Sequence, residues 1–176
     1  MIRVAVTGPE STGKTMLCAQ LSNHFGCPVV AEYARTYLEK LNRPYTFEEV
    51  EMIALTQLKQ ESEILNTNPD LLIADTELLV IKIWMQHKFN KIPPWLEMKL
   101  AEQEYDLYLL CNADIAWEYD PLRENPGAGK YFFDLYLNEL KNRNYNYIVI
   151  SGNYQQRFDS AVEKIMKIIN SRIDKK

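Results

Sequence analysis

Hydrophobic residues occur along the chain in five short runs, and each run predicts a β-strand. The runs are continuous rather than alternating with polar residues, which is typical of strands in a parallel sheet that helices cover on both faces. They are Ile2–Val6, Val29–Ala31, Leu71–Ala74, Leu107–Cys111 and Tyr147–Ile150.

Between these runs the apolar positions recur with the period of an α-helix. Leu17, Leu21 and Phe25 lie four residues apart on one helical face. A longer helix is predicted over residues 47–65, and Thr46 with Glu49 forms a capping box at its start. Two further helical stripes are Leu79, Val80, Ile83, Trp84 and His87, and then Phe158, Val162, Ile165, Met166 and Ile169. Strands that alternate with helices predict an α/β fold with a five-stranded, mostly parallel sheet and helices on both faces.

The segment after the first predicted strand has the pattern of a phosphate-binding loop. It consists of Gly8, Pro9, Glu10, Ser11, Thr12, Gly13, Lys14 and Thr15, and it matches G-x-x-x-x-G-K-[ST] at every position. A strand precedes it and a helix follows it, which is the context in which backbone N–H groups cradle phosphates. Lys14 can reach the β- and γ-phosphates, and the Thr15 hydroxyl can ligate magnesium. A chance glycine-rich turn is the alternative; the full match favours binding of a nucleoside triphosphate with Mg²⁺.

Composition narrows the class of protein. The chain has 176 residues, of which 47% are hydrophobic and 25% are charged, and this suits one domain over residues 1–176. The net charge is −4 without a block of Lys or Arg, so we expect no nucleic-acid partner. No run approaches a membrane span, and no signal peptide precedes the first strand, so we expect a soluble, cytoplasmic protein. Cys18, Cys27 and Cys111 have no metal-binding spacing, which favours reduced thiols in or near the core. The sequence does not indicate the oligomeric state.

Two carboxylates follow predicted strands, at the sheet edge where α/β proteins bind ligands. Asp75 ends Leu-Leu-Ile-Ala-Asp, the form of a Walker B motif, and is a candidate magnesium ligand. Its alternative role is to cap the next helix. Glu32 begins Glu-Tyr-Ala-Arg, which ends at Arg35. Glu32 is a candidate general base, and the alternative is a surface ion pair with Arg35.

A long irregular stretch, Tyr119 to Lys130, contains two prolines and two glycines. A loop of this length in a compact domain is usually functional or mobile, and it predicts a lid over about residues 117–130. Arg123 in this stretch could stabilise charge on the transferring phosphate, and the alternative is a solvated loop arginine. Trp84 and Trp117 are candidates to stack on a base, and the alternative is a place in the core. Trp84 lies on an apolar stripe, whereas Trp117 has fewer apolar neighbours in the sequence and is the better candidate. His24 and His87 lack ligand spacing and are interpreted as surface or edge residues.

Together these motifs resemble the ribosylnicotinamide kinase domain of the NadR family. The resemblance rests on the phosphate loop, on Glu32-Tyr33-Ala34-Arg35, on Asp75-Thr76, and on the segment Trp117 to Arg123 with its Asp120. It implies a P-loop fold of the nucleoside-kinase type and ATP-dependent phosphorylation of nicotinamide riboside to nicotinamide mononucleotide.

The resemblance also implies roles for individual residues. Gly8 to Thr15 would take the triphosphate, and Thr15 with Asp75 would hold magnesium. The acceptor would lie against Glu32, Tyr33, Arg35, Asp75, Trp84, Trp117 and Asp120. Arg123 would act from the lid, and Gly152, Asn153 and Arg157 would lie near the adenine. Multifunctional NadR proteins carry further domains before the kinase, whereas this chain starts at the first predicted strand of the kinase.

Two other functions remain open at this point. One is another nucleoside or nucleotide kinase. A nucleoside monophosphate acceptor would need extra arginines, and only Arg35 and Arg43 are evident between the early strands and the lid. The other is a regulatory ATPase that switches a partner, for which Glu77 could orient the attacking water.

Overall fold

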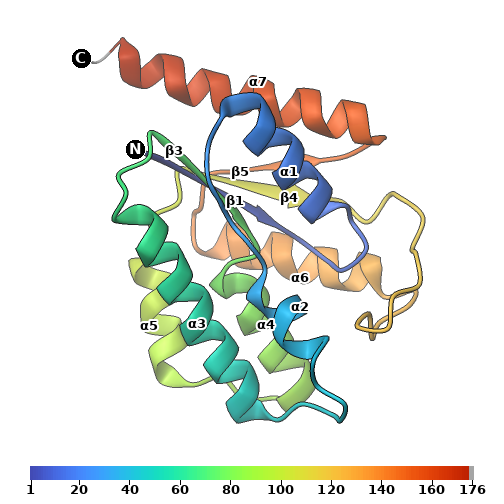
Figure 1. The fold of residues 1–176 in the computed structure, drawn as a ribbon. Helices are drawn as coiled ribbons and strands as arrows, with labels where there is room; N and C mark the ends of the chain where they lie inside the picture. Colours follow the sequence, from blue (N-terminus) through green and yellow to red (C-terminus); the bar gives the residue numbers. More distant parts are fainter. Residues whose placement is uncertain (175–176) are drawn as a thin grey trace.

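Five strands form one sheet in the computed structural model, which describes residues 1–174 (Figure 1). The strands are β1 (Ile2–Thr7), β2 (Val29–Val30), β3 (Leu71–Asp75), β4 (Leu107–Cys111) and β5 (Tyr147–Ile150). Their order across the sheet is β2-β3-β1-β4-β5, and every neighbouring pair is parallel. The predicted α/β P-loop fold is confirmed. The sheet is fully parallel rather than mostly parallel.

Helices cover both faces of this sheet. The helices α1 (Lys14–Phe25) and α7 (Tyr154–Ile173) lie together on one face, above the sheet in Figure 1. The other face is covered by α3 (Phe47–Leu65), α4 (Leu78–Phe89), α5 (Pro94–Glu102) and α6 (Gly129–Asn142), with the short α2 (Tyr33–Leu38) beside α3. The capping box of Thr46 and Glu49 is present at the start of α3.

The apolar runs are continuous because the strands are covered by helices on both faces. Val4 and Val6 of β1 pack into the cluster that contains α1 and α7, whereas Ala5 between them packs into the cluster on the opposite face. Successive side chains of a strand point to opposite faces, so a strand covered on both sides is apolar at most of its positions.

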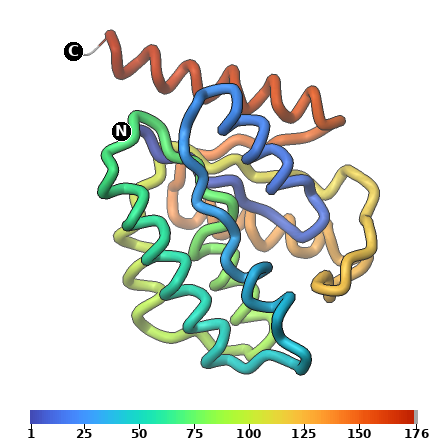
Figure 2. Tube along the Cα trace, in the orientation of Figure 1, coloured from blue at the N-terminus to red at the C-terminus, as the bar shows by residue number. Residues whose placement is uncertain are grey.

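The long segment between β4 and α6 lies next to the loop that follows β1. Because β1 and β4 are hydrogen-bonded neighbours, the chain leaves both strands at the same sheet edge. Figure 2 shows this segment, in yellow and orange, as an excursion outside the helices beside the blue loop after β1. The topology therefore brings the predicted lid to the phosphate loop.

The three cysteines are buried and free. Cys18 of α1 and Cys111 of β4 lie in the cluster between the sheet and α1 with α7, as does Cys27 before β2. The prediction of reduced core thiols agrees with this placement. Within residues 1–174, no helix is long and apolar enough to cross a membrane.

Candidate functional site

The backbone conformation of the phosphate loop requires glycine at two positions. Gly8 has a φ of 129°, and a Cβ at this position would lie 2.7 Å from the carbonyl oxygen of Cys111 on β4. Gly13, with a φ of 76°, is left-handed immediately before α1. These two positions require glycine because a side chain would be strained at both and would meet main-chain atoms at the first.

Side chains of the loop are tied to its own carbonyl groups. The Lys14 Nζ donates hydrogen bonds to the carbonyl oxygens of Gly8 at 3.0 Å and Pro9 at 2.7 Å. The Thr12 hydroxyl also donates to Pro9, at 2.8 Å. Lys14 thus lies over the concave side of the loop, where a bound phosphate would replace the carbonyl oxygens as its partner.

Asp75 closes β3 beneath the loop. Its side chain is nearly inaccessible, and its Oδ1 has no hydrogen-bond partner among the residues that the structure describes. Burial raises the pKa of Asp75, and a hydrogen bond from Thr15 together with the charge of Lys14 opposes that rise. An orphaned carboxylate oxygen next to a hydroxyl fits Mg²⁺, which takes oxygen ligands. Residues 1–174 hold no group of three or more His, Cys, Asp or Glu side chains suited to a metal, so phosphate oxygens and water would complete the coordination.

Glu77, not Asp75, caps the helix that follows β3. A Glu77 carboxylate oxygen accepts a hydrogen bond from the Leu79 N–H at 2.5 Å, and the other accepts one from the Thr7 hydroxyl at 3.1 Å. The alternative role of Asp75 as a helix cap is therefore wrong. Glu77 is only 1% exposed, and burial raises its pKa to about 7. Because it does not line the cavity, it is not placed to orient an attacking water.

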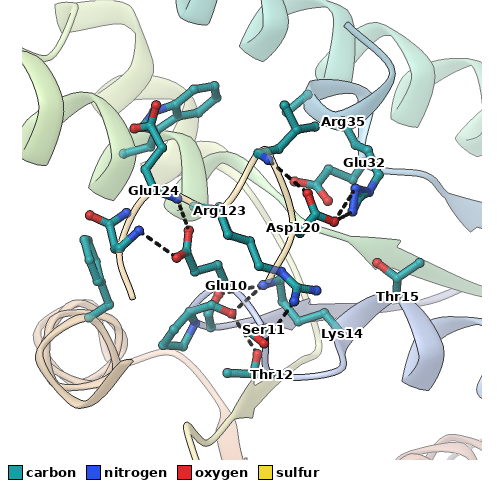
Figure 3. A pocket seen from close by; sticks show the side chains of 18 of the residues that line it. Glu10, Ser11, Thr12, Lys14, Thr15, Glu32, Arg35, Asp120, Arg123 and Glu124 are labelled. Atoms are coloured by element: carbon teal, nitrogen blue, oxygen red, sulfur yellow. Dashed lines mark hydrogen bonds and ion pairs between the residues drawn. The ribbon is translucent and has the colours of Figure 1, made fainter. Parts of the chain in front are cut away.

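Glu32 and Arg35 come from the start of α2 and face the loop across the cavity (Figure 3). Burial is the main cause that raises the pKa of Glu32, and the nearby Lys14 opposes it. Arg35 Nη1 donates to the Asp120 carboxylate of the lid at 3.1 Å. Arg35 is therefore paired with the lid and not, as the alternative had it, with Glu32. Tyr33 does not line the cavity; its ring lies 6.3 Å from that of Tyr37.

The lid is fastened to the phosphate loop by hydrogen bonds. The Glu10 carboxylate accepts from the backbone N–H groups of Glu124 at 3.2 Å and Asn125 at 2.8 Å. The Ser11 hydroxyl accepts from Arg123 Nη1 at 3.1 Å and from the Glu118 N–H at 2.9 Å. Arg123 is therefore held directly over the loop, as Figure 3 shows.

The two tryptophan candidates differ in position. Trp84 on α4 lines the cavity, and its Nε1–H donates to the Tyr45 hydroxyl at 2.9 Å. Trp117 does not line the cavity; its Nε1–H is directed to Glu10 at 3.4 Å. The preference for Trp117 as the stacking residue is thus reversed. His87, interpreted as a surface residue, is exposed at the cavity wall, with its ring 4.7 Å from Phe132.

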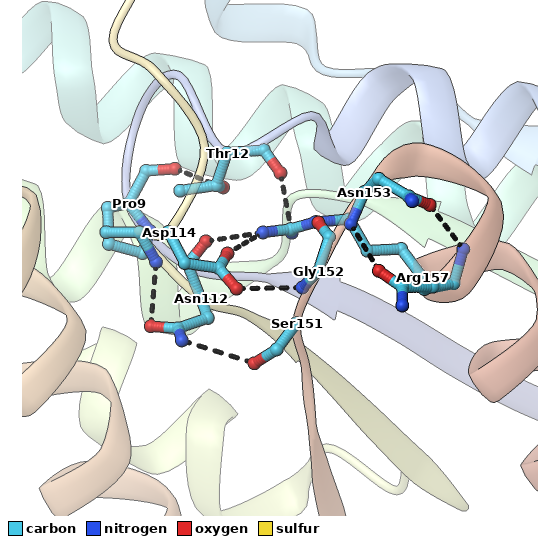
Figure 4. Close-up of polar contacts among 10 residues, drawn as sticks. Pro9, Thr12, Asn112, Asp114, Ser151, Gly152, Asn153 and Arg157 are labelled. Atoms are coloured by element: carbon cyan, nitrogen blue, oxygen red, sulfur yellow. Dashed lines mark hydrogen bonds and ion pairs between the residues drawn. The ribbon is translucent and has the colours of Figure 1, made fainter.

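The turn into α7, expected near the adenine, packs against the phosphate loop. Asn153 caps α7 in a capping box with Gln156, and Arg157 is buried against main-chain carbonyls (Figure 4). Gly152, Asn153 and Arg157 do not line the cavity. Tyr154, for which the sequence gives no signal, does line it, and its ring lies 3.2 Å from the place that a Cβ on Gly13 would take.

One cavity joins most of these groups and has a volume of about 360 Å³. It is lined by the whole phosphate loop, and around it by Glu32, Arg35, Tyr45, Ile83, Trp84, His87, Lys88, Ile115, Glu118, Asp120, Arg123, Glu124, Phe132, Tyr136 and Tyr154. Tyr45, Tyr136 and Tyr154 carry no sequence signal that separates them from the other tyrosines of the chain. Only the tertiary fold brings them to the loop.

Comparisons with known proteins agree with this geometry. The family profile described as AAA domain matches residues 3–157. The trifunctional NAD biosynthesis/regulator protein NadR of Salmonella typhimurium (strain LT2) is 24% identical over 178 residues, an alignment that covers 96% of this chain and 43% of the relative. The chain thus spans less than half the length of that relative.

Two solved structures have a similar fold. A crystal structure of NadR protein in complex with NR superposes with a TM-score of 0.82 at 21% identity, over 94% of this chain and 51% of the other. A deoxyadenosine kinase from M. mycoides superposes with a TM-score of 0.65 at 16% identity, over 97% of this chain and 100% of the other. The resemblance to NadR noted in the sequence is confirmed. Because the profile covers most of its residues, the chain belongs to the AAA domain family and is NadR-like in sequence and fold.

Proposed function

We propose that this protein is a nucleoside kinase that transfers the γ-phosphoryl group of ATP to a ribose hydroxyl, with nicotinamide riboside as its preferred acceptor. One observation carries the proposal: a phosphate loop and the half-buried carboxylate of Glu32 open into the same cavity. That volume, about 360 Å³, lies in the range of small-molecule sites.

The donor half of the reaction falls to the phosphate loop. ATP with magnesium would supply the transferable phosphoryl group when bound. The loop N–H groups and Lys14 would hold the phosphates, while Thr15 and the unpartnered oxygen of Asp75 would hold the metal ion. Arg123, which the lid already holds at Ser11, would neutralise charge on the transferring group.

Glu32 is the better candidate for the general base. It lines the cavity, whereas Asp75 is buried beneath the loop and does not. Burial raises the pKa of Glu32, so its carboxylate is more basic than an ordinary glutamate. A base with a raised pKa takes the proton of an attacking hydroxyl more readily.

The charges of the cavity favour an acceptor without a phosphate. Five carboxylates and four Lys or Arg side chains line it. Arg35 is paired with Asp120, and Lys88 with Glu124 at 3.0 Å, so neither cation is available to an acceptor phosphate. A neutral or positively charged acceptor suits this balance, and the electron-rich rings of Trp84 and Tyr45 suit a pyridinium. The NadR protein of similar fold was crystallised with NR.

The test is ADP release with magnesium, ATP and a panel of acceptors. The panel contains nicotinamide riboside, uridine, cytidine, adenosine, thymidine and their monophosphates, and the Lys14→Ala variant provides the background. Fastest turnover with nicotinamide riboside supports the proposal. Preference for another nucleoside keeps the kinase and changes its acceptor. ATP hydrolysis that no acceptor accelerates would overturn the kinase and support a regulatory ATPase.

A further inference from the structure

Arg157 is a buried cation directly behind the phosphate loop. Arg157 lies in the first turns of α7 and is 2% exposed, and it is not part of the cavity wall. A buried charge is costly unless hydrogen bonds and an opposite charge compensate it. The arrangement of its partners therefore indicates what the residue does.

The guanidinium group joins three segments that are far apart in the sequence (Figure 4). Nε donates to the Gly152 carbonyl at 2.7 Å, Nη1 to the Thr12 carbonyl at 3.1 Å, and Nη2 to the Asn112 carbonyl at 3.0 Å. Nη2 is also paired with the Asp114 carboxylate, which accepts the Gly152 N–H at 2.8 Å as well. A planar group with donors in several fixed directions makes all of these bonds together, which an ammonium group does not reproduce.

The bond to Thr12 has a consequence on the other side of the same peptide group. In a planar trans peptide, the C=O of one residue and the N–H of the next point in opposite directions. Arg157 lies behind the loop and holds the Thr12 carbonyl on the side away from the cavity. The N–H of the same peptide group, that of Gly13, therefore points towards the cavity. Gly13 lines the cavity and begins the turn into α1, where N–H groups bind anions.

We propose that Arg157 is a positioning residue for phosphate binding: by holding the Thr12 carbonyl, it keeps the Gly13 N–H aimed at the bound triphosphate. The inference rests on the proposed function in that the loop must bind a nucleoside triphosphate. It differs from the role expected from the sequence, in which Arg157 lies near the adenine. Its effect is on phosphates and is independent of the base.

The experiment measures the affinities of ATP and inorganic tripolyphosphate by calorimetry, below the unfolding temperature of each variant. Arg157→Lys keeps the charge and loses most of the fixed bonds. We expect both ligands to bind roughly 10- to 100-fold more weakly, because the Thr12 carbonyl loses its fixed partner and binding must then order the loop. Arg143→Lys is the matched control, because Arg143 on the far side of the fold is paired with Glu97 and Glu139. Its phosphate affinity should stay within about threefold of the wild type.

Three results would overturn the proposal. If Arg157→Lys lowers only the unfolding temperature, the residue is structural. If ATP binding weakens and tripolyphosphate binding does not, Arg157 acts on the adenine side. If Arg143→Lys weakens tripolyphosphate equally, general destabilisation is the cause. Failure of the wild-type protein to bind either ligand would instead contradict the proposed function.

A second measurement needs only the wild-type protein, and so does not depend on the folding of a variant. In amide NMR spectra, tripolyphosphate should shift the Gly13 N–H resonance more than that of Gly26, at the other end of α1. A Gly13 resonance that does not move while tripolyphosphate binds would also overturn the proposal.

Discussion

The two halves of the cavity are built from different parts of the chain. The phosphate half is one continuous segment of eight residues whose main chain is held by Arg157, by Lys14 and by the close contact of Gly8 with β4. The acceptor half is made of side chains from α2, from the turn before α3, from α4 and from the lid. In the proposed reaction, main-chain groups would bind the donor and side chains would face the acceptor.

Because of this difference, the two halves of the cavity tolerate amino-acid substitutions differently. The phosphate half depends on backbone conformation, so few substitutions leave it intact. The acceptor half depends on side chains at separate positions, so single substitutions can alter its selectivity. Glu10 connects the halves, because a side chain of the phosphate loop accepts hydrogen bonds from the lid backbone.

The strongest test of the phosphate half is Lys14→Ala. Because Lys14, among the residues that the structure describes, bonds to carbonyl oxygens of its own loop alone, its loss removes charge from the site without disturbing the core. We expect phosphoryl transfer to fall to background with every acceptor, and circular dichroism to stay unchanged. Turnover equal to the wild type would remove the loop from the mechanism.

The acceptor half is tested by Glu32→Gln. Loss of a general base typically lowers kcat by roughly 10²- to 10⁴-fold, and ATP affinity should remain because the loop is untouched. The pH dependence gives an independent check. Since burial raises the pKa of Glu32, kcat of the wild type should fall on the acidic side at a pH above the 4.5 of an ordinary glutamate. If kcat of Glu32→Gln still falls on the acidic side at the same pH, the titrating group is not Glu32.

Glu77 lies under the junction of the halves, between Thr7 before the loop and the start of α4. Its folded pKa of about 7 exceeds the ordinary 4.5, so the folded state holds a proton that the unfolded state has lost. Stability conferred by this proton is present at low pH and lost as pH rises from about 4.5 to 7. Glu77→Gln should gain on the order of 2 to 3 kcal/mol over wild type at pH 8, and little at pH 4.5.

Chemical denaturation at these two pH values measures that difference. Asp75 and Glu32, whose pKa values burial also raises, remain in the variant, so part of the pH dependence should persist. An equal effect of Glu77→Gln at both pH values would contradict the assignment to this carboxyl group.

The smallest expected effect distinguishes the two tryptophans. Trp84→Phe removes the hydrogen bond to Tyr45 and should raise the acceptor KM by about 10-fold, with the KM for ATP unchanged. The matched variant is Trp117→Phe, which removes the hydrogen bond of the lid to the Glu10 side chain and keeps an aromatic ring beside Tyr119. An acceptor KM that responds to Trp117 and not to Trp84 would restore the assignment made from the sequence.

The sequence predicted the five strands, the phosphate loop and the position of Asp75 because these depend on local patterns. The helices α2, α5 and α6 were missed: α2 has only 6 residues, and Pro94 and Gly129 at the starts of α5 and α6 suggest loops. Arg157 and Trp117 were misplaced for a different reason. Whether an arginine is buried behind a loop or exposed inside a cavity depends on contacts with distant segments, such as Thr12 and Asn112. No local pattern encodes these contacts.

The burial of the three cysteines determines how slowly the folded protein reacts with electrophiles. Burial raises the pKa of Cys18 well above its ordinary value, raises that of Cys27, and raises that of Cys111 to about 11. Because the thiolate is the reactive form, alkylating reagents at neutral pH encounter almost none of it while the chain is folded. Cys111 also contributes the carbonyl oxygen against which Gly8 packs. Its rate of alkylation thus reports how often the sheet opens behind the phosphate loop, without any introduced label.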